Sequence, residues 1–185
     1  MTSKDTIEEA IRLSLENPMI PDRNNMVSTG QSLTPLIYNL VKLMKPKACF
    51  EWGPGQSSHA FLMADPEMKL LSYEHDVEWT NAALKALQEK DASLLERFEV
   101  YTVPDKESYV NTMFSNDTFD IILVDGMWRP DCLVTAERIA KPGGVILCHD
   151  WYSDKIWNER ESNLEHYGNH IDTIQPQEPI AIFTK

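Results

Sequence analysis

From residue 47 onward, short apolar runs alternate with helix-like stretches, and this alternation most constrains the fold. The runs that predict strands are 49–52, 69–73, 98–103, 121–124, 145–148, 170–174 and 180–183. The stretches that predict helices between them are 57–63, 77–89, 108–114, 130–140 and 154–166. Because parallel strands need a crossover connection, this order predicts right-handed βαβ units and a parallel sheet covered by helices on both faces.

The end of the chain departs from this rule. Only residues 175–179 separate the last two expected strands, which is too short for a parallel crossover, so these strands should form an antiparallel hairpin. The sequence therefore predicts an α/β fold: a Rossmann-like, doubly wound, seven-stranded, mostly parallel sheet with an antiparallel last strand. Two further helices are expected ahead of the sheet, at 5–17 and 33–44, with a mobile segment at 21–30. We divide the chain into an N-terminal helix and mobile segment, 1–30, and a cofactor-binding domain, 31–185.

The composition argues against several classes of protein. The 185 residues carry 29 acidic and 17 basic side chains, a net charge of −12, which disfavours a nucleic-acid partner. No apolar stretch is long enough for a bilayer, and the first residues lack the layout of a signal peptide, so a cytoplasmic protein is expected. Cys49, Cys132 and Cys148 form no C-x-x-C pair, and Cys49 and Cys148, which lie inside apolar runs, are expected to be buried thiols. Apolar stripes on the first two helices are compatible with a homodimer.

A glycine turn follows the first expected strand and opens a helix. The turn and its polar neighbours are Glu51, Gly53, Pro54, Gly55, Ser57 and Ser58. Glycine lets the backbone approach a ligand closely, and a helix N-terminus offers unpaired N–H groups to an anion. With the carboxylate of Glu51 beside it, the turn suits the ammonium and carboxylate of an amino-acid moiety. A nucleotide phosphate would favour a third small residue where Ser58 stands, and a tight turn without any ligand is the remaining alternative.

Glu74 ends the second expected strand, about 20 residues after Gly53. At this spacing an acid can accept hydrogen bonds from the two hydroxyls of a ribose. The alternative is that Glu74 only caps the helix starting at Val77. Since Asp76 is better placed to cap that helix, we expect Glu74 to bind the sugar.

Two more strands end in polar residues that should be neighbours. Asp125 closes a run of Ile and Val, and His149-Asp150 closes the next one. Asp125 could hold a cofactor amine while His149 accepts a proton from the acceptor, because histidine titrates near neutral pH. Alternatively, Asp125 and Asp150 could hold a divalent metal, or His149 could be an ordinary core residue. Arg129 follows in the same loop and could bind an anionic acceptor, or lie exposed.

Taken in order, these motifs resemble those of class I S-adenosylmethionine (SAM)-dependent methyltransferases. The matching positions are Glu51-x-Gly53-x-Gly55 as their first motif, Glu74 as their ribose acid, Asp125 as their fourth-strand acid, and Lys141-Pro142-Gly143-Gly144 as their turn before strand five. The segment 28–32 resembles the one that precedes motif one in small-molecule O-methyltransferases of the caffeoyl-CoA type.

A narrower resemblance concerns the loop from Val124 to Cys132 and the terminal His149-Asp150. Together they look like a group of small bacterial methyltransferase-like proteins without assigned substrates, in which Arg129 would face the pocket. The metal-dependent O-methyltransferases differ, because they place Asp-Asn after strand five and a catalytic lysine after strand four. A divalent metal is therefore not favoured here.

The resemblance implies methyl transfer from SAM to an oxygen, or less readily a nitrogen, of a small molecule. The turn residues and Glu51 would hold the methionine part, Glu74 the ribose, and His75 and Asp105 the adenine side. His149 would be the general base, with Arg129 orienting the acceptor. The alternatives are a SAM-binding protein without methyl transfer and an NAD-dependent oxidoreductase, against which the missing third glycine and the terminal hairpin argue.

Overall fold

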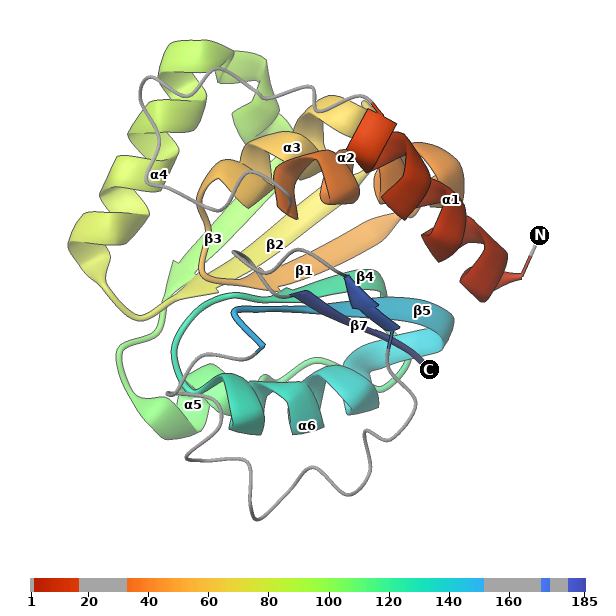
Figure 1. Ribbon diagram of the computed structural model, residues 1–185. Coiled ribbons are helices and arrows are strands. Elements are labelled where there is room, and N and C mark those ends of the chain that lie inside the picture. Colours follow the sequence, from red (N-terminus) through yellow and green to blue (C-terminus); the bar gives the residue numbers. More distant parts are fainter. Residues whose placement is uncertain (1, 17–32, 152–170, 174–179) are drawn as a thin grey trace.

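The structure is a computed structural model that describes residues 2–16, 33–151, 171–173 and 180–185 (Figure 1). Seven strands in this part of the chain form one sheet, in the order β3-β2-β1-β4-β5-β7-β6. The strands are β1 (Ala48–Trp52), β2 (Lys69–Glu74), β3 (Phe98–Thr102), β4 (Phe119–Val124), β5 (Ala140–His149), β6 (Ile171–Thr173) and β7 (Ile180–Thr184).

The pairing of the strands confirms the predicted fold class. Strands β1 to β5 pair in parallel, whereas β7 pairs antiparallel with both β5 and β6. The predicted hairpin between the last two strands is therefore present. The strand order reverses between β1 and β4, and in open α/β sheets ligands bind outside the carboxyl ends of the strands at such a point.

Helices cover both faces of the sheet (Figure 1). One face carries α1 (Ser3–Glu16), α2 (Leu33–Met44), α3 (Gln56–Ala64), α4 (Val77–Lys90) and the 3-10 helix η1 (Ala92–Arg97). The opposite face carries α5 (Lys106–Val110) and α6 (Arg129–Ile139). None of the helices in the described part of the chain is long and apolar enough to cross a membrane.

The central strands are buried on both faces because their side chains alternate between two hydrophobic cores. In β4, Ile121 and Leu123 pack in the core beneath α1 to α4, whereas Ile122 and Val124 pack in the core beneath α5 and α6. An unbroken apolar run is thus what a central parallel strand requires. The same alternation places Glu51 of β1 beside α3.

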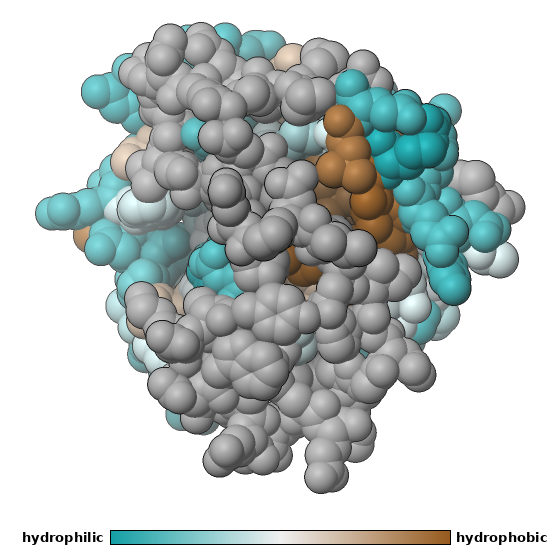
Figure 2. Space-filling view, viewed as in Figure 1, coloured by the Kyte–Doolittle hydropathy of each residue, from teal (hydrophilic) through white to brown (hydrophobic). Residues whose placement is uncertain are grey.

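Helix α1 packs against α2 and shares its core. Ile7 and Ala10 are fully buried, and Ser3 Oγ donates a 3.0 Å hydrogen bond to the carbonyl of Gly143 in β5. Hydrophilic residues cover the outward side of α1, and a hydrophobic band lies along its inner side (Figure 2). The apolar stripes of α1 and α2 therefore contact each other within one chain. Homodimerisation and the division of the chain at residue 30 remain predictions.

One expected helix is shifted, and one helix was not expected. The helix expected at 108–114 is α5, which runs from Lys106 to Val110; it starts earlier because Asp105 caps it by accepting the Ser108 N–H at 2.8 Å. The helix η1 was not expected; Asp91 caps it through the Ser93 N–H. The expected helix at 154–166 and the expected mobile segment at 21–30 lie outside the described residues.

Candidate functional site

The carboxyl ends of β1, β2 and β4 meet at one rim of the sheet. Past the end of β1, the Gly53 N–H donates to the carbonyl of Tyr73 in β2 at 2.9 Å. On the other side of β1, the Asp125 N–H donates to the Trp52 carbonyl at 3.0 Å. The turns that carry Gly53, Glu74 and Asp125 thus lie side by side, as the motif order predicted.

Gly53 is where the backbone needs a glycine. Its φ is +87°, and a Cβ atom would lie 2.9 Å from Asp125 C and from the Gly126 N and Cα atoms. Gly126 is equally confined, because a Cβ there would lie 2.0 Å from the Tyr109 hydroxyl. The two glycines let the turns after β1 and β4 touch. In this structure the close approach that Gly53 permits is to the backbone of Gly126.

Glu51 is fully buried and held by three serine hydroxyls. Ser57 Oγ donates to Oε2 at 2.8 Å, while Ser58 Oγ and Ser72 Oγ donate to Oε1 at 2.5 and 2.6 Å. Burial raises the pKa of Glu51 to about 7, although the serine hydrogen bonds oppose this shift. The predicted contact of Glu51 with a ligand ammonium is therefore replaced here by an internal serine cage. Ser57 and Ser58 likewise donate to Glu51.

The glycine turn is held from two sides. Ser58 Oγ accepts the Gly55 N–H at 3.1 Å, which ties the turn to the first helical residues of α3. From α4, Trp79 Nε1 donates to the Pro54 carbonyl at 2.7 Å. The contact with Trp79 was missed by sequence reasoning, because a single tryptophan on a helix carries no signal for a partner so far along the chain.

Glu74 is buried and uses one carboxylate oxygen locally. Its Oε1 accepts the N–H groups of His75 and Asp76 at 2.8 and 2.9 Å. Asp76 caps α4 through the N–H groups of Glu78 and Trp79, as expected. The second oxygen of Glu74 makes no hydrogen bond among the described residues. Glu74 thus keeps one acceptor oxygen of the carboxylate predicted to bind a ribose.

Three aromatic side chains lie beside Glu74. The ring of Tyr109 is 5.3 Å from that of Trp128 and 6.2 Å from that of His75, centre to centre. The Tyr109 hydroxyl and His75 Nδ1 are buried without hydrogen-bond partners among the described residues, although His75 Nδ1 lies 2.6 Å from Glu74 Oε1 in poor alignment. Asp105, also predicted on the adenine side, uses its carboxylate to cap α5.

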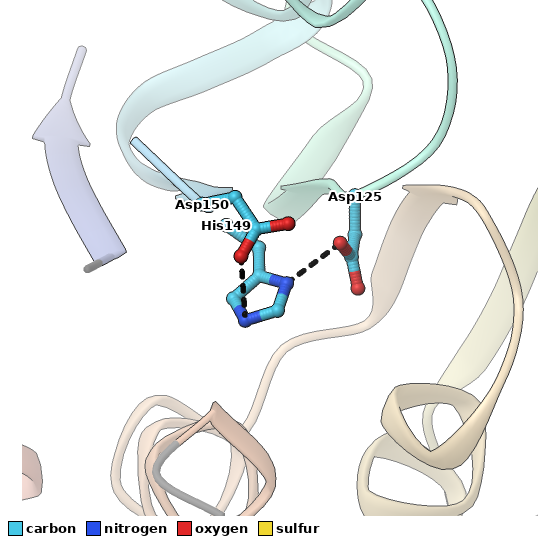
Figure 3. Close-up of side chains that lie close together, drawn as sticks. All are labelled: Asp125, His149 and Asp150. Carbon is cyan, nitrogen blue, oxygen red and sulfur yellow. Dashed lines mark hydrogen bonds and ion pairs between the residues drawn. The ribbon is translucent and has the colours of Figure 1, made fainter. Parts of the chain in front are cut away.

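A histidine–aspartate pair stands at the neighbouring strand ends (Figure 3). His149 Nδ1 lies 2.8 Å from Asp125 Oδ1, and both side chains are less than a tenth exposed. Burial alone would lower the pKa of His149, but the hydrogen bond to Asp125 and the charges of Asp125 and Asp150 outweigh it and raise this pKa. His149 Nε2 is buried and lies 3.7 Å from Asp150 Oδ1, but it makes no hydrogen bond within the described part of the chain (Figure 3).

Arg129 is bonded within the protein at every N–H group. Its Nη2 donates to Oδ1 and to the backbone carbonyl of Asp125, both at 3.1 Å. Its Nη1 donates to Asp150 Oδ2 at 2.8 Å and to the His149 carbonyl at 3.0 Å, and Nε donates to the Gly126 carbonyl. Since a guanidinium has five N–H donors, none remains for the anionic acceptor that the sequence suggested. In this arrangement Arg129 positions acids.

The rim fits SAM in its donor and acceptor groups. Glu74 offers an unused oxygen for a diol, and His75 and Tyr109 offer buried polar atoms and ring faces beside it. The turn at Gly53-Pro54-Gly55 leads into α3, whose first turn presents backbone N–H groups. The acids along the rim also suit a cofactor that carries positive charge on its sulfonium and ammonium groups.

The sequence matches no protein-family model and no curated protein. Solved structures do match the fold. The O-methyltransferase TomG from Streptomyces achromogenes, in complex with SAM, is similar with a TM-score of 0.66 and 17% identity over 98% of this chain and 90% of that chain. An O-methyltransferase from Bacillus cereus, in complex with SAH, gives 0.67 and 17% over 98% and 91%. The SAH-bound methyltransferase PaMTH1 from Podospora anserina gives 0.63 and 16% over 98% and 88%. This chain therefore has the class I methyltransferase fold over nearly its whole length.

Proposed function

We propose that this protein binds SAM at the rim of β1, β2 and β4 and transfers its methyl group to an oxygen, or a nitrogen, of a small molecule. The observation that carries the proposal is the buried His149–Asp125 pair at the strand ends next to the glycine turn. Structural neighbours with the same fold are methyltransferases solved with SAM or SAH, which supports the choice of cofactor.

Different residues of the rim hold different parts of the cofactor. Glu74 accepts hydrogen bonds from the ribose at the carboxylate oxygen that the protein leaves unused. His75, Tyr109 and Trp128 lie on the adenine side. The turn at Gly53-Pro54-Gly55 and the first turn of α3 hold the methionine part, while Glu51 keeps that turn in place through its serines.

SAM supplies a methyl group that is already strongly electrophilic on its sulfonium sulfur. The protein therefore has to align the acceptor and take up its proton. His149 takes up the proton. Because its Nδ1–H donates to Asp125, the neutral ring keeps a lone pair on Nε2. As the acceptor oxygen bonds to the methyl carbon and the carbon–sulfur bond breaks, the proton of the acceptor passes to Nε2.

Calorimetric titration tests the cofactor. We expect SAM and S-adenosylhomocysteine to bind and NAD not to bind. Glu74→Gln is the informative variant, and Glu78→Gln on the exposed side of α4 is its control, since both remove one negative charge. Binding of NAD in place of SAM would overturn the assignment in favour of an oxidoreductase.

Methyl transfer is tested separately from binding. A panel of phenols, alcohols, carboxylic acids and amines is incubated with SAM, and S-adenosylhomocysteine is measured as the common product. Transfer to any of these acceptors supports the proposal. If SAM binds and no acceptor is methylated, the protein is a SAM-binding protein without methyl transfer.

A further inference from the structure

Asp125, His149 and Asp150 have the spacing of a metal site. Each offers one potential ligand atom, and these atoms lie within 4.8 Å of one another (Figure 3). Two carboxylates and an imidazole can bind several divalent cations. Spacing alone does not make a metal site, however. Two carboxylates this close together need a positive charge near them, and a side chain of the protein can supply that charge as well as a metal ion can.

The described residues already contain that counter-charge. Arg129 forms ion pairs with Asp125 at 3.1 Å and with Asp150 at 2.8 Å, so one guanidinium joins the two carboxylates. The planar fork of arginine suits this bridging role in a way that a lysine ammonium does not. A divalent ion between the same two acids would compete with a positive charge that belongs to the chain.

Arg129 is also fixed from behind. Three of its five hydrogen bonds go to backbone carbonyls, two in the loop after β4 and one at the end of β5. Its side chain is 18% exposed. Trp128, which precedes Arg129, and Asp150, its ion-pair partner, have φ of +51° and +54°. This conformation costs free energy for residues other than glycine. The local backbone is thus shaped around the guanidinium.

We propose that Arg129 is the resident cation of this site, in the place between Asp125 and Asp150 that a divalent metal ion would take. Arg129 is then a positioning residue. It donates to Asp125 Oδ1, the same oxygen that faces His149 Nδ1, and so fixes the carboxylate that orients the histidine. The His149–Asp125 pair works without a metal ion. This inference concerns cation binding, so its test does not depend on methyl transfer.

The test is a thermal-shift and calorimetric titration of chelator-treated protein with Mn²⁺. We expect no change for the wild type, because the guanidinium occupies the site. Arg129→Gln removes the charge and leaves both carboxylates in place. For this variant we expect saturating Mn²⁺ to raise the Tm by about 5–10 °C, the shift that a ligand at 100 times its Kd gives a protein of this size. Arg129→Lys should show a smaller rise.

Two controls make the result specific. Arg97→Gln also removes an arginine that donates to backbone carbonyls, those of Leu62, Asp65 and Met68, but no carboxylate in the described part of the chain bonds to that guanidinium. It should lose stability without gaining a response to Mn²⁺. The double variant Arg129→Gln/Asp150→Asn should lose the response that the single variant gains.

Three results would overturn the inference. The first is a wild type that Mn²⁺ stabilises and that loses this effect on Asp150→Asn. The second is a folded Arg129→Gln protein that does not respond to Mn²⁺. If Arg129→Gln is unfolded in chelator, refolding with Mn²⁺ decides: recovery of folded protein supports the inference, and the third overturning result is no recovery.

Discussion

The contact between the turns after β1 and β4 gives a quantitative prediction through Gly126. A Cβ at this position would lie 2.0 Å from the Tyr109 hydroxyl, far inside van der Waals contact. Tyr109 cannot swing away easily, because it is fully buried and packs edge-on against Trp128 and His75. Gly126 does not have a positive φ, so alanine suffers no backbone strain there. The main cost of Gly126→Ala is therefore the clash with this oxygen atom, since the other close contacts of the Cβ, with Gly53 N and Trp52 C, are at 3.2 Å.

We expect Gly126→Ala to lower the free energy of unfolding by about 1–3 kcal/mol, the usual cost of overpacking. For a chain of 185 residues this lowers the Tm by about 2–12 °C. Tyr109→Phe removes the oxygen, which has no hydrogen-bond partner among the described residues. Tyr109→Phe alone should be neutral or stabilising by about 1 kcal/mol. In the double variant the cost of Gly126→Ala should fall by about 1 kcal/mol or more.

Gly53→Ala is the matched control for this cycle. Gly53 has a φ of +87°, and the atoms that a Cβ would meet at 2.9 Å are all backbone. Its cost should therefore be the same with Tyr109 or with Tyr109→Phe. Urea unfolding of the single and double variants measures both cycles. An equal cost of Gly126→Ala in both backgrounds would refute the packing that we describe at the rim.

Three further predictions concern the charged groups of the site. Burial raises the pKa of Glu51 from 4.5 to about 7, so its ionisation destabilises the fold as the pH rises through that interval. The free energy of unfolding of Glu51→Gln, relative to that of the wild type, should therefore rise by up to about 3 kcal/mol between pH 4.5 and 8, as measured by urea unfolding. His149→Ala should lower kcat by about 10²–10⁴-fold while the calorimetric Kd for SAM changes little, and an equal loss of both would remove His149 as the base. Glu74→Gln should weaken SAM binding by about 10–100-fold, the value of a hydrogen bond to a charged group, whereas Glu78→Gln should not.

The fold could be predicted because the sequence shows both the apolar runs of buried strands and the helical spacing of apolar residues between them. Unbroken apolar runs such as 121–124 are what a strand buried on both faces needs, and the five residues at 175–179 decide the direction of the last strand. The predicted start of α5 is wrong because Asp105 was interpreted as a ligand-binding residue. An aspartate three residues ahead of Ser108 is also a typical helix cap, and this is its role in the structure.

The serine cage around Glu51 has a signal in the sequence. The register pairs Glu51 with Ser72, and the predicted parallel order of β1 and β2 already places these two side chains on one face. Ser57 and Ser58 stand at the start of the next helix, on the same side. A buried carboxylate surrounded by three hydroxyls follows from that order. From the sequence, Glu51, Ser57 and Ser58 are instead assigned to the ligand.

The role of Arg129 could not be read from the sequence. The spacing of Asp125 and Arg129, four residues apart, is common to many helical ion pairs. Here the two residues are joined by a loop whose path depends on a left-handed backbone conformation at Trp128. A tryptophan in the sequence does not predict that conformation. Only this path brings the guanidinium to Asp150 and to the carbonyl of His149 at the end of β5.

Buried polar atoms that make no hydrogen bond among the described residues lie in two halves of the rim. Beyond β2 they are His75 Nδ1, which lies 2.6 Å from Glu74 Oε1, and the Tyr109 hydroxyl; beyond β5 they include His149 Nε2, which lies 3.7 Å from Asp150 Oδ1. The glycine contact between the turns after β1 and β4 lies between the halves in the strand order. Because buried polar atoms normally find partners, each half is suited to a ligand group. In the proposed function, the β2 half takes the nucleoside of the cofactor and the β5 half takes the proton of the acceptor.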